Sequence, residues 1–439
     1  MLKLGFLGVT QKTFKSQKED IYNRSIDVLL KLSQKLSFEL IYSPSLIEDP
    51  FILQKILEEW QDKIDFLLFQ TTTFAGGFLG EILAKSDLPV IFWAIPELEI
   101  KGNLKWNSLC SLNFFASLIK KFNPKKKFDW IYTFPEEENK ELIEILKVLK
   151  ILKNLKSLKI IHLVGTAPGF FNLEVSYELL KSKFGIEIKN YPSLDIIVEI
   201  IKSLDKNELE KTKEEIKKII NIPIEEKWLD EGLKIAIALE ELAKKENAKA
   251  IASRCWPDFR ETLSIFPCFS FAIVSEKIPV SCEGDILSAL GMYILKEISE
   301  KPTSVLDLVY YDNKSIILWH CGNTSLSLTK PPISLDYQFN HPGMGSTIDS
   351  KFKEGEVTLF SFNQDLKNAL IFSGKISYPF ESKFKGSFAY ITDLPIKPRE
   401  LFDTIVKEGF PHHLVLSYGN FVALIKKVLY WLEIPSITF

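Results

Sequence analysis

The sequence of 439 residues has no long hydrophobic run and no excess of charge of one sign. No apolar stretch approaches the ~18–20 residues that a membrane helix needs, so no membrane partner is expected. The apolar run near the N-terminus, Leu4 to Val9, is too short for a signal peptide and predicts a first strand in a cytoplasmic protein. The net charge of −2, without a basic patch or finger motif, argues against a nucleic-acid partner.

Cysteine and arginine are also scarce. The five cysteines show no CxxC spacing, which argues against a zinc site or a disulfide framework and favours reduced, buried thiols. Two of only four arginines, Arg254 and Arg260, lie just before Glu261. The chain otherwise uses lysine, so two arginines at this place suggest that the planar guanidinium, with its fixed set of hydrogen-bond donors, is needed there. Pairing with nearby surface carboxylates explains the two arginines equally well.

The length exceeds what one core usually supports, and the hydrophobic pattern predicts three domains. Short apolar strands alternate with amphipathic helices over residues 1–155, and the pattern restarts over 156–278, which predicts two Rossmann-like α/β domains with parallel sheets. Residues 279–439 hold short β-rich segments separated by Gly, Asn and Pro. They predict a barrel-like C-terminal domain that completes the functional site.

Four polar residues stand out on this apolar background: Glu261, Asp285, His320 and His413. Two carboxylates and one or two imidazoles suit a divalent metal such as Mn2+. Each residue also has a structural explanation. Asp285 precedes an apolar helix and is a natural N-terminal cap, while Glu261 on a short helix would ordinarily face solvent.

Two neighbours of these residues complicate the assignment. Glu283 competes with Asp285 for both of its possible roles, that of a functional carboxylate and that of a helix cap. His412 and His413 are adjacent, so in an extended strand they point in opposite directions and only one can easily join a given site.

The chain resembles the L-fucose/L-arabinose isomerase superfamily, and is most similar to its shorter fucose-isomerase-like members. The motifs that carry the resemblance are CWPDFRETL, IPVSCEGDILSALGMYIL, LWHCGNTSLSL and PHHLVLSYG, and the block from CEGD to HCG is the most specific part. Weaker N-terminal motifs, such as FQTTTFAGG, together with KIIHLVGTAPGFF, extend the resemblance over nearly the whole chain. It implies an aldose–ketose isomerase that acts on a monosaccharide. It also implies a homo-oligomer, a trimer or hexamer, in which the N-terminal domain reaches a neighbouring subunit's active site.

The resemblance also implies which residues act. Glu261, Asp285 and His413 match the positions that bind Mn2+ in fucose isomerases, and the separation of 24 positions from Glu261 to Asp285 agrees with that pattern. His320 matches a further metal-binding histidine of arabinose isomerases. The chain is shorter than the true fucose isomerases, so its sugar is left open.

The expected reaction passes through a cis-enediol, with the metal as Lewis acid and the two carboxylates, Glu261 and Asp285, exchanging roles as base and acid. Arg254 and Trp256 are candidates for binding sugar hydroxyls. An alternative is a non-catalytic sugar-binding or regulatory protein on the same fold. A phosphate-binding role for GTAPGF, from Gly165, is disfavoured because the motif lacks the Lys-Ser/Thr of a P-loop.

Overall fold

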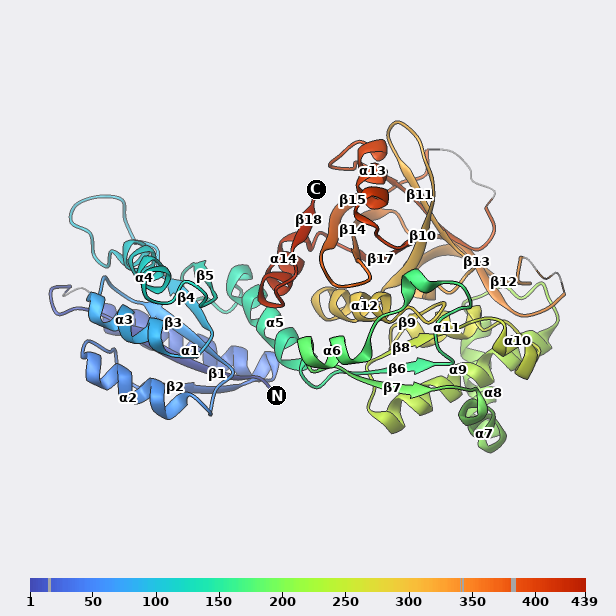
Figure 1. Ribbon diagram of the computed structural model, residues 1–439, viewed down its shortest axis with the longest axis horizontal. Helices are drawn as coiled ribbons and strands as arrows, with labels where there is room; N and C mark the ends of the chain where they lie inside the picture. The colour runs from blue at the N-terminus through green and yellow to red at the C-terminus, as the bar shows by residue number, and fades with distance from the viewer. Residues whose placement is uncertain (15–16, 340, 342, 380–383) are drawn as a thin grey trace. The chain divides into compact units, whose positions relative to one another are not determined.

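A computed structural model describes residues 1–14, 17–339, 341, 343–379 and 384–439 (Figure 1). The chain divides into two compact units, Met1–Asn154 and Leu155–Phe439, which are described separately. None of the helices in these residues is both long enough and apolar enough to cross a membrane.

The first unit contains a five-stranded parallel sheet with the strand order β2-β1-β3-β4-β5. Its strands are short runs that alternate with helices, as predicted for residues 1–155, and three of them are buried along almost their whole length, as expected for a sheet covered on both faces. The strands are β1 (Lys3–Val9), β2 (Glu39–Tyr42), β3 (Phe66–Thr71), β4 (Val90–Ala94) and β5 (Phe128–Tyr132).

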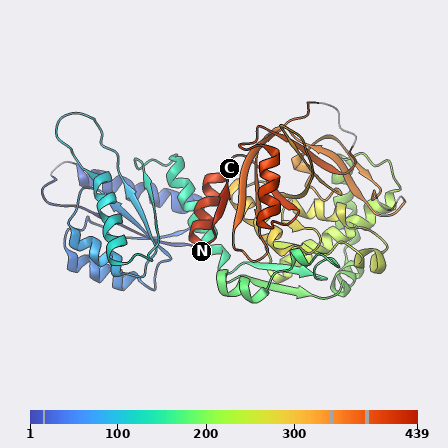
Figure 2. The same cartoon turned by 45° about the horizontal axis from the view of Figure 1, so that its top comes forward.

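Helices cover both faces of this sheet (Figures 1 and 2). Three of them pack on one face through an apolar cluster that includes Trp60, Leu83 and Phe115. Asp49 caps the N-terminus of α2, because its side chain accepts hydrogen bonds from the amides of Phe51 and Ile52. The helices are α1 (Lys18–Leu36), α2 (Pro50–Trp60), α3 (Gly77–Lys85), α4 (Ser108–Phe122) and α5 (Lys140–Leu155).

The second unit begins with a smaller parallel sheet with the strand order β7-β6-β8-β9. Its strands are β6 (Lys159–Leu163), β7 (Glu187–Tyr191), β8 (Ala250–Ser253) and β9 (Val280–Ser281). The helical elements of this region are η1 (Phe171–Leu173), α6 (Tyr177–Phe184), α7 (Asp195–Ser203), α8 (Lys206–Lys217), α9 (Glu226–Glu246), α10 (Asp258–Leu263) and α11 (Cys268–Ser275).

A nine-stranded sheet follows, and six of its strands close into an antiparallel ring. The ring closes because β15 and β16 also pair, through Ile376 and Ile391. Alternate side chains fill its interior with an apolar core. The ring strands are β10 (Ser304–Tyr311), β11 (Ile316–His320), β14 (Gly355–Phe362), β15 (Ala369–Ile376), β16 (Ser387–Thr392) and β17 (His413–Tyr418).

Further elements surround the ring: η2 (Leu326–Leu328), β12 (Thr329–Asp336), β13 (Thr347–Phe352), α13 (Pro398–Glu408), α14 (Val422–Trp431) and β18 (Ser436–Thr438). The predicted fold class, parallel-sheet α/β regions followed by a β-rich barrel-like region, is confirmed. The division of the second unit into domains 156–278 and 279–439 stays a prediction.

Helix α12 (Ile286–Ser299) joins the two parts of the second unit, because it packs against β8 and β9 on one side and β14 and β17 on the other. Almost all of its residues are buried. Gly291 permits the close approach, since a Cβ there would meet Phe360 and Val415 at 3.2–3.3 Å. The N-terminus of α12 therefore lies where the end of the parallel sheet meets the ring.

Candidate active site

Glu283 lies in the short loop between β9 and α12. Its φ of 60° and the φ of 75° at Gly284 form a left-handed turn, which is a strained conformation for a glutamate. Gly284 is required here, because a Cβ would stand 2.1 Å from the carbonyl oxygen of Gly165. The amide of Ala167 also donates to the Glu283 carbonyl at 2.9 Å. The GTAPGF segment thus supports the loop that carries Glu283.

Asp285 is the N-cap of α12 and is 2% exposed. Its Oδ1 accepts a hydrogen bond from the Ser288 amide at 2.9 Å, and its Oδ2 accepts one from the Ser288 hydroxyl at 2.6 Å. Its Oδ2 also lies 2.8 Å from Nδ1 of His413. Both carboxylate oxygens are therefore engaged, and one of them fixes the imidazole of His413.

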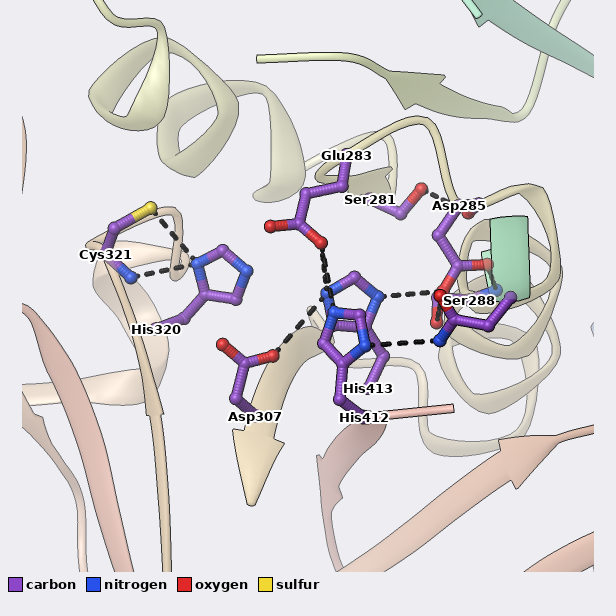
Figure 3. A network of polar contacts seen from close by, with 10 residues as sticks. Ser281, Glu283, Asp285, Ser288, Asp307, His320, Cys321, His412 and His413 are labelled. Atoms are coloured by element: carbon purple, nitrogen blue, oxygen red, sulfur yellow. Dashed lines mark hydrogen bonds and ion pairs between the residues drawn. The ribbon is translucent and has the colours of Figure 1, made fainter. Parts of the chain in front are cut away.

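The strand register brings His413 and Asp307 together. They are direct partners on the antiparallel strands β17 and β10, while the preceding pair, Leu306 and Leu414, points into the ring core. With its Nδ1 fixed, His413 directs its Nε2 toward the oxygens of Glu283, 3.4 Å away, and Asp307, 3.6 Å away (Figure 3).

His320 ends β11 and completes the group. Its ring centre lies 5.8 Å from that of His413. The ligand atoms of Asp307, His320 and His413 all lie within 4.8 Å of one another. Those of Glu283, His412 and His413 do the same. His413 belongs to both sets, so the two sets form one continuous group of candidate ligands.

His412 does not point away from this group as an extended strand would require. Its Nε2 lies 3.1 Å from the Glu283 carboxylate, and its ring is 4.3 Å from that of His413, centre to centre. The alternation rule does not apply, because β17 begins only at His413. His412 is partly exposed and packs against the ring of Phe170.

Three buried ligand atoms have no hydrogen-bond partner among the residues that the structure describes: Oδ1 of Asp307, Nε2 of His320 and Nε2 of His413. Buried polar atoms normally have a hydrogen-bond partner, so these three atoms are suited to binding an ion or a substrate. Together with Glu283 they offer two carboxylates and two imidazoles. This donor set fits a divalent ion such as Mn2+.

Interactions between the carboxylates and the imidazoles of this site shift their pKa values in the direction opposite to the effect of burial. Burial raises the pKa of Glu283, but three neighbouring histidines outweigh it and lower the value. Burial likewise raises the pKa of Asp285, but His413 and the hydrogen bonds from Ser288 outweigh it and lower the value. Burial lowers the pKa of His413, but Asp285, Asp307 and Glu283 outweigh it and raise the value. The carboxylates are thus ionised, and in the absence of a cation the imidazole retains its proton more readily than usual.

A cavity of about 500 Å³ opens beside this group, and Glu283, Asp307 and His320 line it. Trp256 also lines it and is 38% exposed, as a residue that contacts a substrate would be. Arg254 does not face the cavity but forms a two-pronged ion pair with Asp258.

The other arginine of this segment, Arg260, does line the cavity. Its guanidinium forms no ion pair or hydrogen bond with any residue that the structure describes. Glu261 follows it on α10, is exposed, and belongs to neither set of candidate ligands within the described part of the chain. The structure therefore brings together Asp285, His320 and His413 but not Glu261.

Asp307 was not among the residues selected from the sequence. The available signal was a carboxylate inside the otherwise apolar and aromatic strand SVLDLVYY. A second signal was spacing: Glu283 and Asp307 are separated by 24 residues, as are Glu261 and Asp285. The spacing alone could not decide between the two pairs.

No family model matches the chain. A sulfoquinovose isomerase from Priestia megaterium (strain ATCC 12872 / QMB1551) is 27% identical over 429 residues, which cover 94% of each chain. Another from Alkalicoccus urumqiensis is 26% identical over 448 residues, covering 100% of this chain and 99% of the relative. A solute binding protein of an ABC transporter from Agrobacterium vitis, bound with alpha-D-tagatopyranose, is 10% identical over 59% of this chain, with a TM-score of 0.17 that is too low to inform the fold.

The relatives carry the name of a sugar isomerase and match this chain along almost its whole length. They confirm the prediction that the chain is an enzyme of the sugar isomerase class.

Proposed function

We propose that this protein is a metal-dependent aldose–ketose isomerase whose ion is held by Glu283, Asp307, His320 and His413. The observation that supports the proposal most strongly is the set of three buried ligand atoms without a hydrogen-bond partner in the described residues. Their cluster adjoins a cavity of sugar-accommodating size. Asp285 then acts as a positioning residue for His413.

A bound divalent ion would supply a Lewis acid that polarises the sugar carbonyl. We assign the transfer of the proton between C1 and C2 to the carboxylate of Glu283. It is ionised, it lines the cavity, and the hydrogen bond with Nε2 of His412 holds one oxygen in place. A carboxylate that takes a proton from one carbon can return it to the neighbouring carbon.

The rest of the cavity suits an anionic sugar. Aromatic rings, among them Trp256 and Trp319, provide apolar surfaces for the faces of a sugar. Arg260 offers a guanidinium that no described residue pairs, and guanidinium groups bind tetrahedral anions through paired hydrogen bonds. The name of the relatives denotes a sugar with a sulfonate group. We therefore propose a sulfonated hexose of the sulfoquinovose type as the substrate.

The same proposal includes Mn2+ as the ion and membership of the L-fucose/L-arabinose isomerase superfamily. It also includes a cytoplasmic location and assembly as a trimer or hexamer. Light scattering coupled to size-exclusion chromatography measures the oligomer directly.

The test of the activity uses protein stripped with a chelator and then supplied with Mn2+. NMR of the sugar should show conversion of sulfoquinovose to its ketose only after the ion is restored, and little conversion of neutral aldoses such as glucose and fucose. Equal turnover before and after stripping, with metal analysis confirming removal, would contradict the proposal. Preference for a neutral sugar would contradict the assigned substrate.

Arg260→Met tests the recognition of the anion. The loss of a hydrogen bond to a charged group costs about 1.5–3 kcal/mol, so kcat/KM for the sulfonated sugar should fall roughly 10- to 100-fold. The exposed Arg399, which pairs with Asp403 on the surface of α13, provides the matched control as Arg399→Met. An equal loss with a neutral sugar would show that Arg260 does not recognise the sulfonate.

A further inference from the structure

Four of the five cysteines converge on the same cavity although the sequence scatters them. Cys255, Cys268, Cys282 and Cys321 all line it, whereas Cys110 lies exposed on α4 in the first unit. All five are free thiols. The neighbouring thiols of Cys255 and Cys321, together with burial, raise the pKa of the Cys282 thiol, so these sulfur atoms lie close together at one wall of the cavity.

Within this wall, Cys268 and Cys321 have sulfur atoms 3.4 Å apart. Cys268 begins α11, and Cys321 directly follows the last residue of β11. A disulfide bond has a length of about 2.05 Å, so the two atoms must approach by only about 1.4 Å, a distance that small side-chain rotations cover. The cavity that both residues line gives a small oxidant a route to them.

Cys321 is also in direct contact with a residue of the candidate active site. It is adjacent in sequence to His320, its amide donates to Nδ1 of that histidine at 2.9 Å, and its sulfur lies 3.2 Å from the same atom. A movement of Cys321 toward Cys268 would therefore change the orientation of the His320 ring. Thiol oxidation and the arrangement of the proposed ligands are thereby linked.

We propose that Cys268 and Cys321 form a redox-sensitive thiol pair that a peroxide converts reversibly to a disulfide, and that the disulfide displaces His320 from the other ligands. One thiol, as thiolate, attacks a peroxide oxygen, the O–O bond breaks, and a sulfenic acid and water form. The second thiol then attacks that sulfur, the S–O bond breaks, and a disulfide and a second water form. Two sulfur atoms lose two electrons in total, and hydrogen peroxide gains them. The disulfide itself is independent of the function proposed above; only its effect on His320 as a metal ligand rests on the ion site proposed there.

The test treats the full-length protein with a small excess of hydrogen peroxide, blocks remaining thiols with N-ethylmaleimide and maps the peptides by mass spectrometry. A cross-linked pair of peptides containing Cys268 and Cys321 is expected, and dithiothreitol should separate them. Cys268→Ser should abolish the cross-link, whereas Cys110→Ser should leave it unchanged. Recovery of both thiols unmodified, or cross-links confined to other cysteines, would overturn the proposal.

A second measurement follows the link to His320. Titration with Mn2+ should show an affinity lowered by about 10- to 100-fold in the oxidised protein and restored by dithiothreitol, because losing a ligand's support has an effect of that size. The oxidised Cys268→Ser variant should show no such change relative to its own reduced form. Equal affinity in the cross-linked and reduced wild-type protein would overturn the link, whether or not the protein proves to be an isomerase.

Discussion

Both units bury polar side chains near the ends of their strands, but the two groups of side chains differ in how many of their polar atoms form hydrogen bonds. In the first unit, the polar cluster at the ends of β1 and β3 is paired internally. The hydroxyl groups of Thr10 and Thr73 lie 2.8 Å apart, Thr72 donates to Gln70 Oε1, and Gln70 Nε2 donates to Ser25. These side chains satisfy one another within the fold.

In the second unit, the group around His413 combines paired and unpaired atoms. Asp285 holds one nitrogen of His413, whereas its other nitrogen, the outward nitrogen of His320 and one oxygen of Asp307 have no hydrogen-bond partner in the described ranges. A closed cluster stabilises the fold and gains little from a ligand. An open one costs desolvation energy until a ligand binds, which is the property expected of a functional site.

The sharpest test of this difference replaces a single oxygen. Glu283→Gln keeps the shape of the side chain but removes the charge of a proposed base and ligand, so turnover should fall by about 10²- to 10⁴-fold. Glu261→Gln is the matched control, since this glutamate is exposed and lies in neither set of candidate ligands in the described chain. Steady-state kinetics with the best sugar measure both. A large loss in Glu261→Gln and none in Glu283→Gln would reverse the assignment and support the pair first inferred from the sequence.

The next effect concerns the residue that positions His413. Asp285→Asn preserves a helix cap but weakens the contact to Nδ1, so the affinity for Mn2+ should fall by roughly 10- to 100-fold in a calorimetric titration. Asp49, the cap of α2, holds no histidine and provides the control as Asp49→Asn. If both variants bind Mn2+ as tightly as the wild type, Asp285 is only a cap.

The stability of the metal-free protein should depend on pH through the group around His413. The pKa of His413 is raised in the fold, so its stabilising effect is complete below the unfolded value of about 6.5 and is lost as the pH rises through the folded value. The pKa of Asp285 is lowered, so its contribution is present above about 3.9 and is lost as the pH falls through the folded value.

The midpoint of thermal unfolding without metal should therefore decline above about pH 6.5, whereas Mn2+ affinity should increase over the same range because the ion replaces a proton. Calorimetry in the presence and absence of Mn2+ measures both trends. A metal-free midpoint that rises steadily above that pH would contradict the description of His413.

The smallest effect is expected from a substitution in the hydrogen-bonded polar cluster at the ends of β1 and β3. Thr72→Val leaves Oε1 of Gln70 without its buried donor, which should lower the free energy of unfolding by about 1–3 kcal/mol. Mn2+ affinity should not change. Thr212→Val, at a partly exposed position on α8, controls for the loss of a hydroxyl group. A larger effect on Mn2+ affinity than on stability would remove the distinction between the two clusters.

The sequence predicted the fold well because the signals for strands and helices are local. Apolar runs such as those at Phe66–Thr71 and Val90–Ala94 became interior parallel strands of the first sheet. The same local signals correctly indicated that the C-terminal part of the chain is β-rich. Closure of the six-stranded ring, which depends on the pairing of Ile376 with Ile391, has no local signal.

The candidate site was predicted in part. Asp285, His320 and His413 were selected because charged or imidazole groups at the ends of apolar segments attract attention. Glu283 was recognised only as a competitor, and Asp307 was missed. A side chain in mid-strand reveals its role only through the residue on the opposite strand, and that partner, His413, is distant in sequence.

The amino-acid sequence by itself determined the type of each element and the chemistry available, namely carboxylates, imidazoles and thiols near glycine turns. Only the tertiary structure decided which of them meet. Local propensity sets the backbone of a few neighbouring residues, whereas a ligand group requires strand register, helix position and loop geometry to agree over more than a hundred residues. That agreement brings the strand of Asp307 against that of His413 and leaves Glu261 facing solvent.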